Sequence, residues 1–313
     1  MEKTQNTQNI KKYIVGIIGI GILGNAIKNT FESIPSIELL YYDKYKEIDN
    51  NNNNNMSSIL DMNKCDIIFV CLPTEFDEVK KEFDKTEIYN VCEELATNKY
   101  KGIIILKSTL EPETTQHISD QYDYLPLNII HNPEFLSART ASEDFKNQKH
   151  IVLGLPTYNT TNNINTTNNS NNININNSNN IHNTNNNTTL IKYLETFFNL
   201  YFPIAKISIC SSTESESMKL FCNSFYATKI QFFTETKLLC DKLEIEYDNV
   251  KEMMLNNGWI NPNHTQIPGH DGNISYGGKC FPKDIKALNQ VFIKNDVTHK
   301  VIESVIEENK TMR

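Results

Sequence analysis

Short apolar runs alternate with amphipathic segments along the first two thirds of the chain. Each run has the length of a buried strand, and the segments between them, such as about Glu78 to Asn98 and Leu190 to Asn199, have helical character. Strands that alternate with helices predict a mostly parallel sheet, which binds ligands at the carboxyl ends of its strands. The predicted strands are Tyr13–Ile18, Glu38–Tyr42, Cys65–Leu72, Gly102–Leu106, Asn128–Ile130 and Ile151–Gly154.

The pattern changes after about residue 210. From Ser212 to about Glu246 it is continuously helical, and a further helix is expected from Asp284 to Phe292, where apolar residues recur at helical spacing. We therefore predict an α/β protein with two domains: a Rossmann-like, doubly wound parallel sheet over 1–210, and a mainly α-helical central domain with a long helix over 211–313.

Asparagine-rich stretches interrupt this pattern twice. Asn50 to Asn55 is a homopolymeric run, which we interpret as an expanded surface loop. Residues 157–189 are about half asparagine, with threonine and serine making up much of the rest. Such a segment cannot bury enough apolar surface to order itself, so a disordered insert within the first domain is expected.

Composition excludes several classes of function. The net charge of −8 and the absence of a basic stripe argue against nucleic acid as a partner. The apolar runs are too short to span a membrane, and the polar N-terminus does not resemble a secretory signal. Seven cysteines without close pairing indicate a reducing, cytoplasmic location, and none has zinc-ligand spacing with histidine, so no metal is expected.

A glycine-rich loop follows the first predicted strand and precedes a predicted helix. Gly19, Gly21 and Gly24 have the G-x-G-x-x-G spacing that binds a dinucleotide in this context. Asp43 ends the second strand, where an acidic residue holds the adenosine ribose and disfavours a 2′-phosphate. The prediction is NAD rather than NADP, although Lys44 and Lys46 favour the opposite choice. An ordinary strand–helix turn with a surface aspartate is the structural alternative.

Two further strands end in small polar residues. Pro73 and Thr74 follow one, and Thr109 follows the other. Because the carboxyl ends of parallel strands share one edge of a sheet, we expect these residues on the cofactor side. Threonine after a strand is also common turn chemistry.

The segment Gly277–Asp284 combines a tight glycine turn with a helix start at Pro282. Cys280 then lies at a helix N-terminus beside Lys279 and Lys283, and both the helix dipole and the ammonium groups favour a nucleophilic thiolate. Asp284 lies four residues on, on the same helix face. A buried, unreactive cysteine is the structural alternative.

The mid-chain helix carries Glu216, Lys219 and Asn223 on one face, which a solvated helix could also show. Together with the glycine loop, the run Asn132–Leu136 and the Cys280 segment, this face resembles the UDP-glucose/GDP-mannose dehydrogenases, the nucleotide-sugar 6-dehydrogenases. The four segments occur in the family's order and span nearly the whole chain.

The resemblance implies a four-electron oxidation of a sugar CH₂OH to a carboxylate with two molecules of NAD. Cys280 would form a thiohemiacetal and then a thioester. Lys219 and Asn223 would stabilise the oxyanion, and Asp284 would manage protons. Glu134 would activate the water that hydrolyses the thioester, with Thr109 nearby at the cofactor side. The substrate would be a nucleotide sugar, and the expected assembly is a homodimer.

The chain departs from the family pattern at several positions. Ala138 stands where the family usually has a second glutamate, and Arg139 stands where a glycine or serine commonly follows it. The family also has an arginine upstream of the cysteine loop, which reaches the substrate of a neighbouring subunit, but residues 259–264 contain no arginine. The short C-terminus implies a form that lacks the family's C-terminal UDP-binding domain. Two alternatives stay open: a two-electron NAD-dependent sugar or hydroxy-acid dehydrogenase, and a non-catalytic NAD-binding protein.

Overall fold

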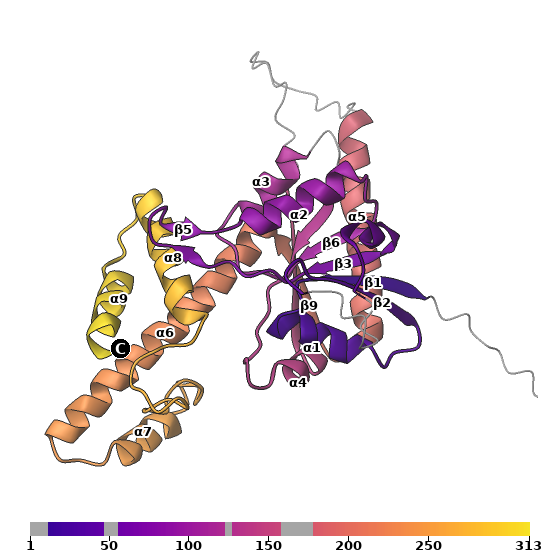
Figure 1. The fold of residues 1–313 in the computed structure, drawn as a ribbon. Helices are drawn as coiled ribbons and strands as arrows, with labels where there is room; N and C mark the ends of the chain where they lie inside the picture. Colours follow the sequence, from indigo (N-terminus) through magenta and orange to yellow (C-terminus); the bar gives the residue numbers. More distant parts are fainter. Residues whose placement is uncertain (1–11, 47–55, 123–126, 158–177) are drawn as a thin grey trace, which may run out of the picture. The chain divides into compact units, whose positions relative to one another are not determined.

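Strands and helices alternate through the first part of the chain, as the apolar pattern predicted. The computed structural model describes residues 12–46, 56–122, 127–157 and 178–313. Up to residue 106 the elements are β1 (Tyr13–Ile18), α1 (Ile22–Phe31), β2 (Ile37–Tyr42), the 3₁₀ helix η1 (Ile59–Lys64), β3 (Ile67–Val70), β4 (Phe76–Asp77), β5 (Glu82–Phe83), α2 (Thr86–Thr97) and β6 (Ile103–Leu106). Next come α3 (Thr114–Gln121), β7 (Asn128–His131), α4 (Ala141–Lys146), β8 (His150–Leu155), α5 (Ser178–Tyr201) and β9 (Lys206–Ser211). The remaining elements are α6 (Ser212–Lys242), α7 (Tyr247–Asn256), α8 (Phe281–Lys294) and α9 (Lys300–Met312), and Figure 1 shows them all.

The described residues divide into two compact units. Segments 74–85, 109–112 and 216–313 form the second unit, and the other described residues form the first. The second unit therefore takes two short segments from the N-terminal half, so contacts do not divide the chain at one point. The linear domain boundary at 210/211 stays a prediction.

The first unit is built on a seven-stranded sheet in the order β2-β1-β3-β6-β7-β8-β9. All neighbouring strands are parallel except β7 and β8, which are antiparallel. Helices α1 and α4 lie on one face of the sheet, and α2 and α3 lie on the other (Figure 1). This confirms the predicted Rossmann-like α/β architecture with helices on both faces.

Alternation along the strands decides which side chains face each helical layer. Val15 and Ile17 of β1 point into a core that they share with Phe31 of α1, Phe145 of α4 and Phe197 of α5. These side chains are almost fully buried, and the aromatic rings meet mainly edge to face. Ile20 and Ala26 belong to the same core, so it also packs the N-terminal half of α1 near the end of β1, where the glycine loop lies.

Two element predictions need correction. The helix predicted from about Glu78 begins only at Thr86, and β4 and β5 form a hairpin before it. The Asp77 carboxylate accepts hydrogen bonds from the backbone N–H of Val79 and Lys80, which closes a tight turn where a helix was expected. Lys81 completes that turn with a positive φ of 59°.

Helix α5 is longer than predicted. It begins at Ser178 rather than near Leu190, so 178–189 of the predicted disordered insert are helical, whereas 158–177 lie outside the described residues. The buried face of α5 includes Leu194, Phe197 and Phe198, and packing of this face supplies a helix nucleus that can extend toward the N-terminus.

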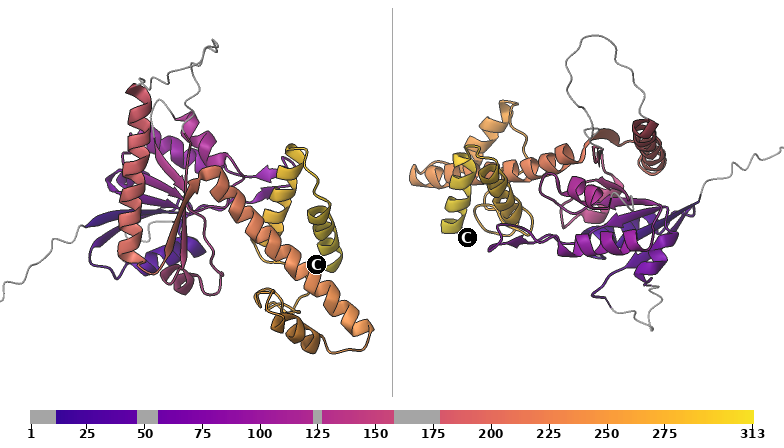
Figure 2. Two further views of the ribbon diagram at one scale, coloured as in Figure 1. Left: turned by 180° about the vertical axis from the view of Figure 1, so that it is seen from behind. Right: turned by 90° about the horizontal axis from the view of Figure 1, so that it is seen from above.

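The second unit is mainly helical, as predicted, and contains the long helix α6 (Figure 2). One cluster joins Ala227 of α6 to Ile285 of α8 and to Val305 and Ile306 of α9. A second cluster joins the C-terminal part of α6 to α7 through Phe233, Cys240 and Tyr247. A third packs Phe83 of the hairpin against Leu220 and Ala287. The hairpin is therefore an integral part of this helical unit.

Candidate functional site

The glycine loop between β1 and α1 has a backbone that excludes side chains at two positions. Gly19 has a φ of +90°, and a Cβ there would lie 2.6 Å from the carbonyl oxygen of Cys71. A Cβ on Gly24 would lie 2.0 Å from the carbonyl oxygen of Gly19. Both glycines are therefore required for the close packing of strand, turn and helix.

Gly21 differs from its two neighbours in the motif. It is the N-cap residue of α1, and a Cβ built on it meets no heavy atom of the described residues within 4 Å. The N-terminus of a helix attracts negative charge through its N–H groups and its dipole. The open space at Gly21 thus fits the pyrophosphate of a dinucleotide.

Asp43 lies directly beside this loop. One carboxylate oxygen accepts a hydrogen bond from the backbone N–H of Ile20 at 2.8 Å, and the other accepts one from Tyr45 at 3.1 Å. Lys46 also reaches the loop and donates to the carbonyl oxygen of Ile20. The acid predicted to hold a ribose is therefore fixed at the glycine loop, with an ammonium group beside it.

The segments that follow β3 and β6 are joined by side chain–backbone hydrogen bonds. In the first unit, Ser108 donates from Oγ to the carbonyl oxygen of Leu72 at 2.7 Å, and the neighbouring Pro73 is exposed. In the second unit, the buried Thr74 donates from Oγ1 to the carbonyl oxygen of Thr109 at 2.7 Å. Thr74 and Thr109 are thus brought together, as their positions after two strands suggested.

Cys280 is the N-cap residue of α8, and Pro282 lies in the first turn of that helix. The backbone N–H of Asp284 donates to the carbonyl oxygen of Cys280 at 3.0 Å, which puts the two residues one turn apart. Cys280 is exposed, in contrast to the buried Cys65, Cys92 and Cys240. The alternative of a buried cysteine at this position is excluded.

Asp284 is completely buried and has two close partners. Asn223 donates from Nδ2 to one carboxylate oxygen at 2.6 Å, and Lys283 donates from Nζ to the other at 2.7 Å. The Lys283 ammonium also lies 4.2 Å from the ring centroid of Phe83. The carboxylate is therefore compensated by a cation and an amide, as a buried charge requires.

Lys219 and Asn223 lie on consecutive turns of α6, and both are buried, as is Glu216 one turn earlier. The alternative of a solvated helix face is therefore wrong, since all three polar side chains are turned into the protein. The structure thus brings Asn223 and Asp284 into contact, with Cys280 and Lys219 each one helical turn away along their own helices.

The loop that leads to Cys280 is held by polar groups that sequence reasoning missed. Buried Ser275 donates from Oγ to Gln231 at 2.5 Å, and its backbone N–H donates to Thr234 at 3.0 Å. Asn309 of α9 donates to Ser275 and to the carbonyl oxygen of Tyr276. These partners are far apart in the chain, and no local pattern singles them out.

Glu134 belongs to the first unit. It is half-buried, and its carboxylate accepts a hydrogen bond from the backbone N–H of Leu136 at 2.6 Å. Glu134 and Cys280 lie in different units, so their predicted cooperation stays a prediction. Two buried residues shortly before Glu134 also have polar partners. Asn132 accepts a hydrogen bond from Lys107 at 2.9 Å, and His131 contacts Ser215 at 2.8 Å. In the sequence, this network is indicated by the polar residues that directly follow two apolar strands, Lys107 after β6 and Asn132 after β7.

Two negative findings apply to the described residues. They contain no group of three or more His, Cys, Asp or Glu side chains arranged to hold a metal ion. None of their helices has the length and hydropathy needed to cross a bilayer.

Comparison with known proteins finds family models that match both parts of the chain. Residues 13–174 match the NAD binding domain of the UDP-glucose/GDP-mannose dehydrogenase family, and residues 213–311 match its central domain. A UDP-glucose 6-dehydrogenase of Rickettsia bellii is 27% identical over 265 residues, which is 80% of this chain and 50% of that protein. One of Campylobacter jejuni is 24% identical, over 78% of this chain and 53% of that protein. This chain thus spans about half the length of these relatives.

Solved structures share the fold. A UDP-glucose dehydrogenase from Pyrobaculum islandicum superposes with a TM-score of 0.74 at 17% identity, over 97% of this chain and 69% of that one. A GDP-mannose dehydrogenase from Pseudomonas aeruginosa gives a TM-score of 0.61 at 17% identity, over 95% of this chain and 68% of that one. With family models matched across both parts, this chain belongs to the UDP-glucose/GDP-mannose dehydrogenase family.

Proposed function

We propose that this protein is an NAD-dependent dehydrogenase that oxidises the CH₂OH group of a nucleotide sugar to a carboxylate. The observation that carries the proposal is the buried Asn223–Asp284 hydrogen bond one turn below the exposed Cys280. A carboxylate, an amide donor and a thiol at a helix N-terminus are the groups that a covalent aldehyde oxidation needs. The matching NAD binding domain and central domain support the same function.

The cofactor would occupy the Gly19–Gly24 loop. Its pyrophosphate fits the open space at Gly21, and Asp43 would accept hydrogen bonds from the adenosine ribose. When bound, NAD accepts one hydride in each of the two oxidations. Asp43 favours NAD because a 2′-phosphate would meet its negative charge, even though Lys46 lies close by.

The residues of the second unit would handle the carbonyl chemistry. The Cys280 thiolate attacks the aldehyde carbon and forms a C–S bond, and the carbonyl oxygen becomes an oxyanion. Loss of the second hydride from this carbon then restores the C=O bond and leaves a thioester on Cys280. One amide hydrogen of Asn223 is used by Asp284, so the other can donate to this oxyanion together with the Lys219 ammonium. Loss of one such donor typically raises the barrier by about 3–4 kcal/mol.

Hydrolysis completes the reaction. We propose that Glu134 accepts a proton from the water that attacks the thioester, after which the C–S bond breaks and the thiol is regenerated. Overall, one CH₂OH group and one water yield a carboxylate, two hydrides and three protons. Asp284, whose carboxylate is already paired with Lys283, would manage the protons on the substrate oxygen.

NADH stoichiometry tests the proposal directly. The protein is mixed with UDP-, GDP- and dTDP-sugars and NAD, and the NADH formed per sugar is measured. Two NADH per sugar support four-electron oxidation, one favours the two-electron dehydrogenase, and none with any sugar favours a non-catalytic NAD-binding protein. Cys280→Ser should abolish the two-NADH reaction while NAD binding survives, and Cys210→Ser is the matched control.

We further propose that the protein acts as a homodimer through α6. Four large apolar side chains on this helix are each more than half exposed: Phe221, Phe225, Phe232 and Leu239. Their spacings of four, seven and seven residues keep them within about 40° of one face, which is the stripe of a helix that packs against another helix. A second copy of this chain would cover the stripe.

A further inference from the structure

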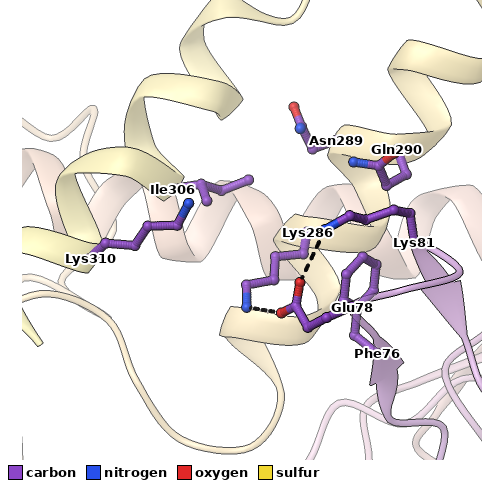
Figure 3. A pocket seen from close by; sticks show the side chains of 8 residues that line it. All are labelled: Phe76, Glu78, Lys81, Lys286, Asn289, Gln290, Ile306 and Lys310. Atoms are coloured by element: carbon purple, nitrogen blue, oxygen red, sulfur yellow. Dashed lines mark hydrogen bonds and ion pairs between the residues drawn. The ribbon is translucent and has the colours of Figure 1, made fainter.

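A cavity in the second unit lies apart from the cysteine site. Its volume is about 230 Å³, well above the roughly 10–15 Å³ that a single water needs, so it has room for a small molecule. Three elements line it, namely the β4–β5 hairpin, α8 and α9 (Figure 3). The lining residues are Phe76, Glu78, Lys81, Lys286, Asn289, Gln290, Ile306 and Lys310.

The cavity and the cysteine site use different faces of α8. At about 100° per residue, Lys286 is rotated by about 200° from Asp284, the residue that contacts Asn223. Asp284 is completely buried, whereas Lys286 is only partly buried and borders the cavity. A ligand in this cavity would therefore not occupy the position of a sugar bound at Cys280.

The charge of the lining is positive, in a protein whose net charge is −8. Three lysines, Lys81, Lys286 and Lys310, line the cavity, against a single carboxylate, Glu78. Glu78 is paired with Lys286 at 2.5 Å and with Lys81 at 3.5 Å, and Figure 3 shows its carboxylate between the two. The hydrogen bond from Lys286 holds the pKa of Glu78 below its ordinary value, so this carboxylate is ionised at neutral pH.

Glu78 thus stands where the anionic group of a ligand could lie. Its side chain is 59% exposed and can swing into solvent at small cost. The Lys310 ammonium forms no ion pair or hydrogen bond with any described residue. Displacement of Glu78 by a ligand anion would leave the three lysines of the lining, from the hairpin, α8 and α9, to bind that anion.

The other lining groups indicate an organic body rather than a bare ion. Phe76 and Ile306 supply apolar surface, and the amides of Asn289 and Gln290 supply donors and acceptors. Small-molecule sites combine apolar walls with a few polar groups in this way. A sugar ring offers C–H groups to the aromatic ring and hydroxyl groups to the amides.

We propose that this cavity binds a phosphate monoester of a sugar or nucleoside, with the phosphate held by Lys81, Lys286 and Lys310. At pH 7 such a group carries a charge of about −1.5 to −2 and three acceptor oxygens, which suits three ammonium donors. The bound ester would also tie α9 to α8 and the hairpin. Asn309, next to Lys310, holds the loop that leads to Cys280, so the site is placed to influence that loop.

Calorimetric titration of the full chain with ribose 5-phosphate tests the proposal. Lys310→Gln and Lys286→Gln should each weaken binding about three- to tenfold, the effect expected for loss of one charge-assisted contact. Glu78→Gln removes the competing carboxylate and should tighten binding by a similar factor. Lys294→Gln on α8 and Lys300→Gln on α9 make the same change in net charge on the same helices but outside the cavity lining, and should leave binding unchanged.

Further titrations identify which part of the ligand is recognised and separate this proposal from the dehydrogenase proposal. Uridine monophosphate, inorganic phosphate and ribose show whether a nucleoside is preferred and whether the phosphate and the organic body are both needed. Cys280→Ser should bind ribose 5-phosphate normally, so failure of the dehydrogenase proposal leaves this site standing. Absence of binding to both the wild type and Glu78→Gln at millimolar ligand would overturn the proposal, as would equal affinity of all five charge variants.

Discussion

Asn223 of α6 and Asp284 of α8 are 61 residues apart in the chain, yet their side chains meet at 2.6 Å. Both are buried, and Asp284 has no exposed surface at all. A buried carboxylate is tolerated only when donors compensate its charge, and here an amide and the Lys283 ammonium do so. This pair fixes the first turn of α8, and with it the position of Cys280, against α6.

Asp284→Asn should destabilise the protein and suppress turnover. The replacement keeps the shape but removes the charge that Lys283 and Asn223 are arranged to bind, and charge-assisted hydrogen bonds contribute about 1.5–3 kcal/mol. Urea unfolding should show a loss of this size, and NADH formation should fall. Asp296→Asn, at an exposed position after α8, should change stability by less than about 0.5 kcal/mol. Equal stability of the two variants would contradict this account of the pair.

Two alanine substitutions in the glycine loop should separate folding from cofactor binding. Gly24→Ala forces a Cβ to within 2.0 Å of the Gly19 carbonyl oxygen and should destabilise the protein by about 2 kcal/mol or more. Gly21→Ala meets no described atom and should unfold like the wild type, but its methyl group fills the space assigned to the pyrophosphate. Thermal unfolding and NAD titration distinguish the effects, and normal NAD affinity of Gly21→Ala would move the cofactor site elsewhere.

Thiol alkylation should single out Cys280. It is exposed, whereas burial raises the pKa of Cys65, Cys71 and Cys92 to about 12, so these three stay protonated and unreactive at pH 8. Peptide mapping after brief treatment with iodoacetamide should find Cys280 modified first, and in urea all seven cysteines should react. Modification of Cys92 as fast as Cys280 in the folded protein would rule out the assigned burial.

The same raised pKa values predict alkaline instability. The folded state holds these thiol protons above the ordinary pKa of 9.0, so the stabilisation is complete below pH 9 and is lost as the pH rises toward 12. Each thiol lowers the free energy of unfolding by about 1.4 kcal/mol per pH unit in this range. Cys92→Ala should reduce the slope by one such increment, as measured by urea unfolding between pH 9 and 11.

A charge on the exposed stripe of α6 should prevent self-association. Phe232→Glu places a carboxylate at the centre of the proposed dimer interface, where it would lose its hydration, and should convert the dimer to a monomer with little loss of stability. Sedimentation measures the mass. Met253→Glu alters an exposed apolar residue on α7 and should leave the dimer intact. A monomeric wild type would refute the interface.

The sequence by itself determined the features that rest on local pattern. The buried strands, the glycine loop with Asp43, the long helix α6 and the start of α8 next to Pro282 all follow from periodicity and from the conformational limits of glycine and proline. Local pattern also produced a wrong prediction. The composition after Glu78 indicated a helix, but in the structure Asp77 closes a turn there and the helix begins only at Thr86.

Only the tertiary structure decided which polar groups meet. Asn223 could have faced solvent, and Ser275, Gln231 and Asn309 carry no signal of their own, until packing of α6, α8 and α9 buried them and each required a partner. The lysine-lined cavity also exists only because a hairpin from the N-terminal half packs beside two C-terminal helices. Desolvation makes a buried polar group pair with whatever the fold brings within reach, and that neighbour is set by the global packing of distant segments rather than by the residues next to it in the chain.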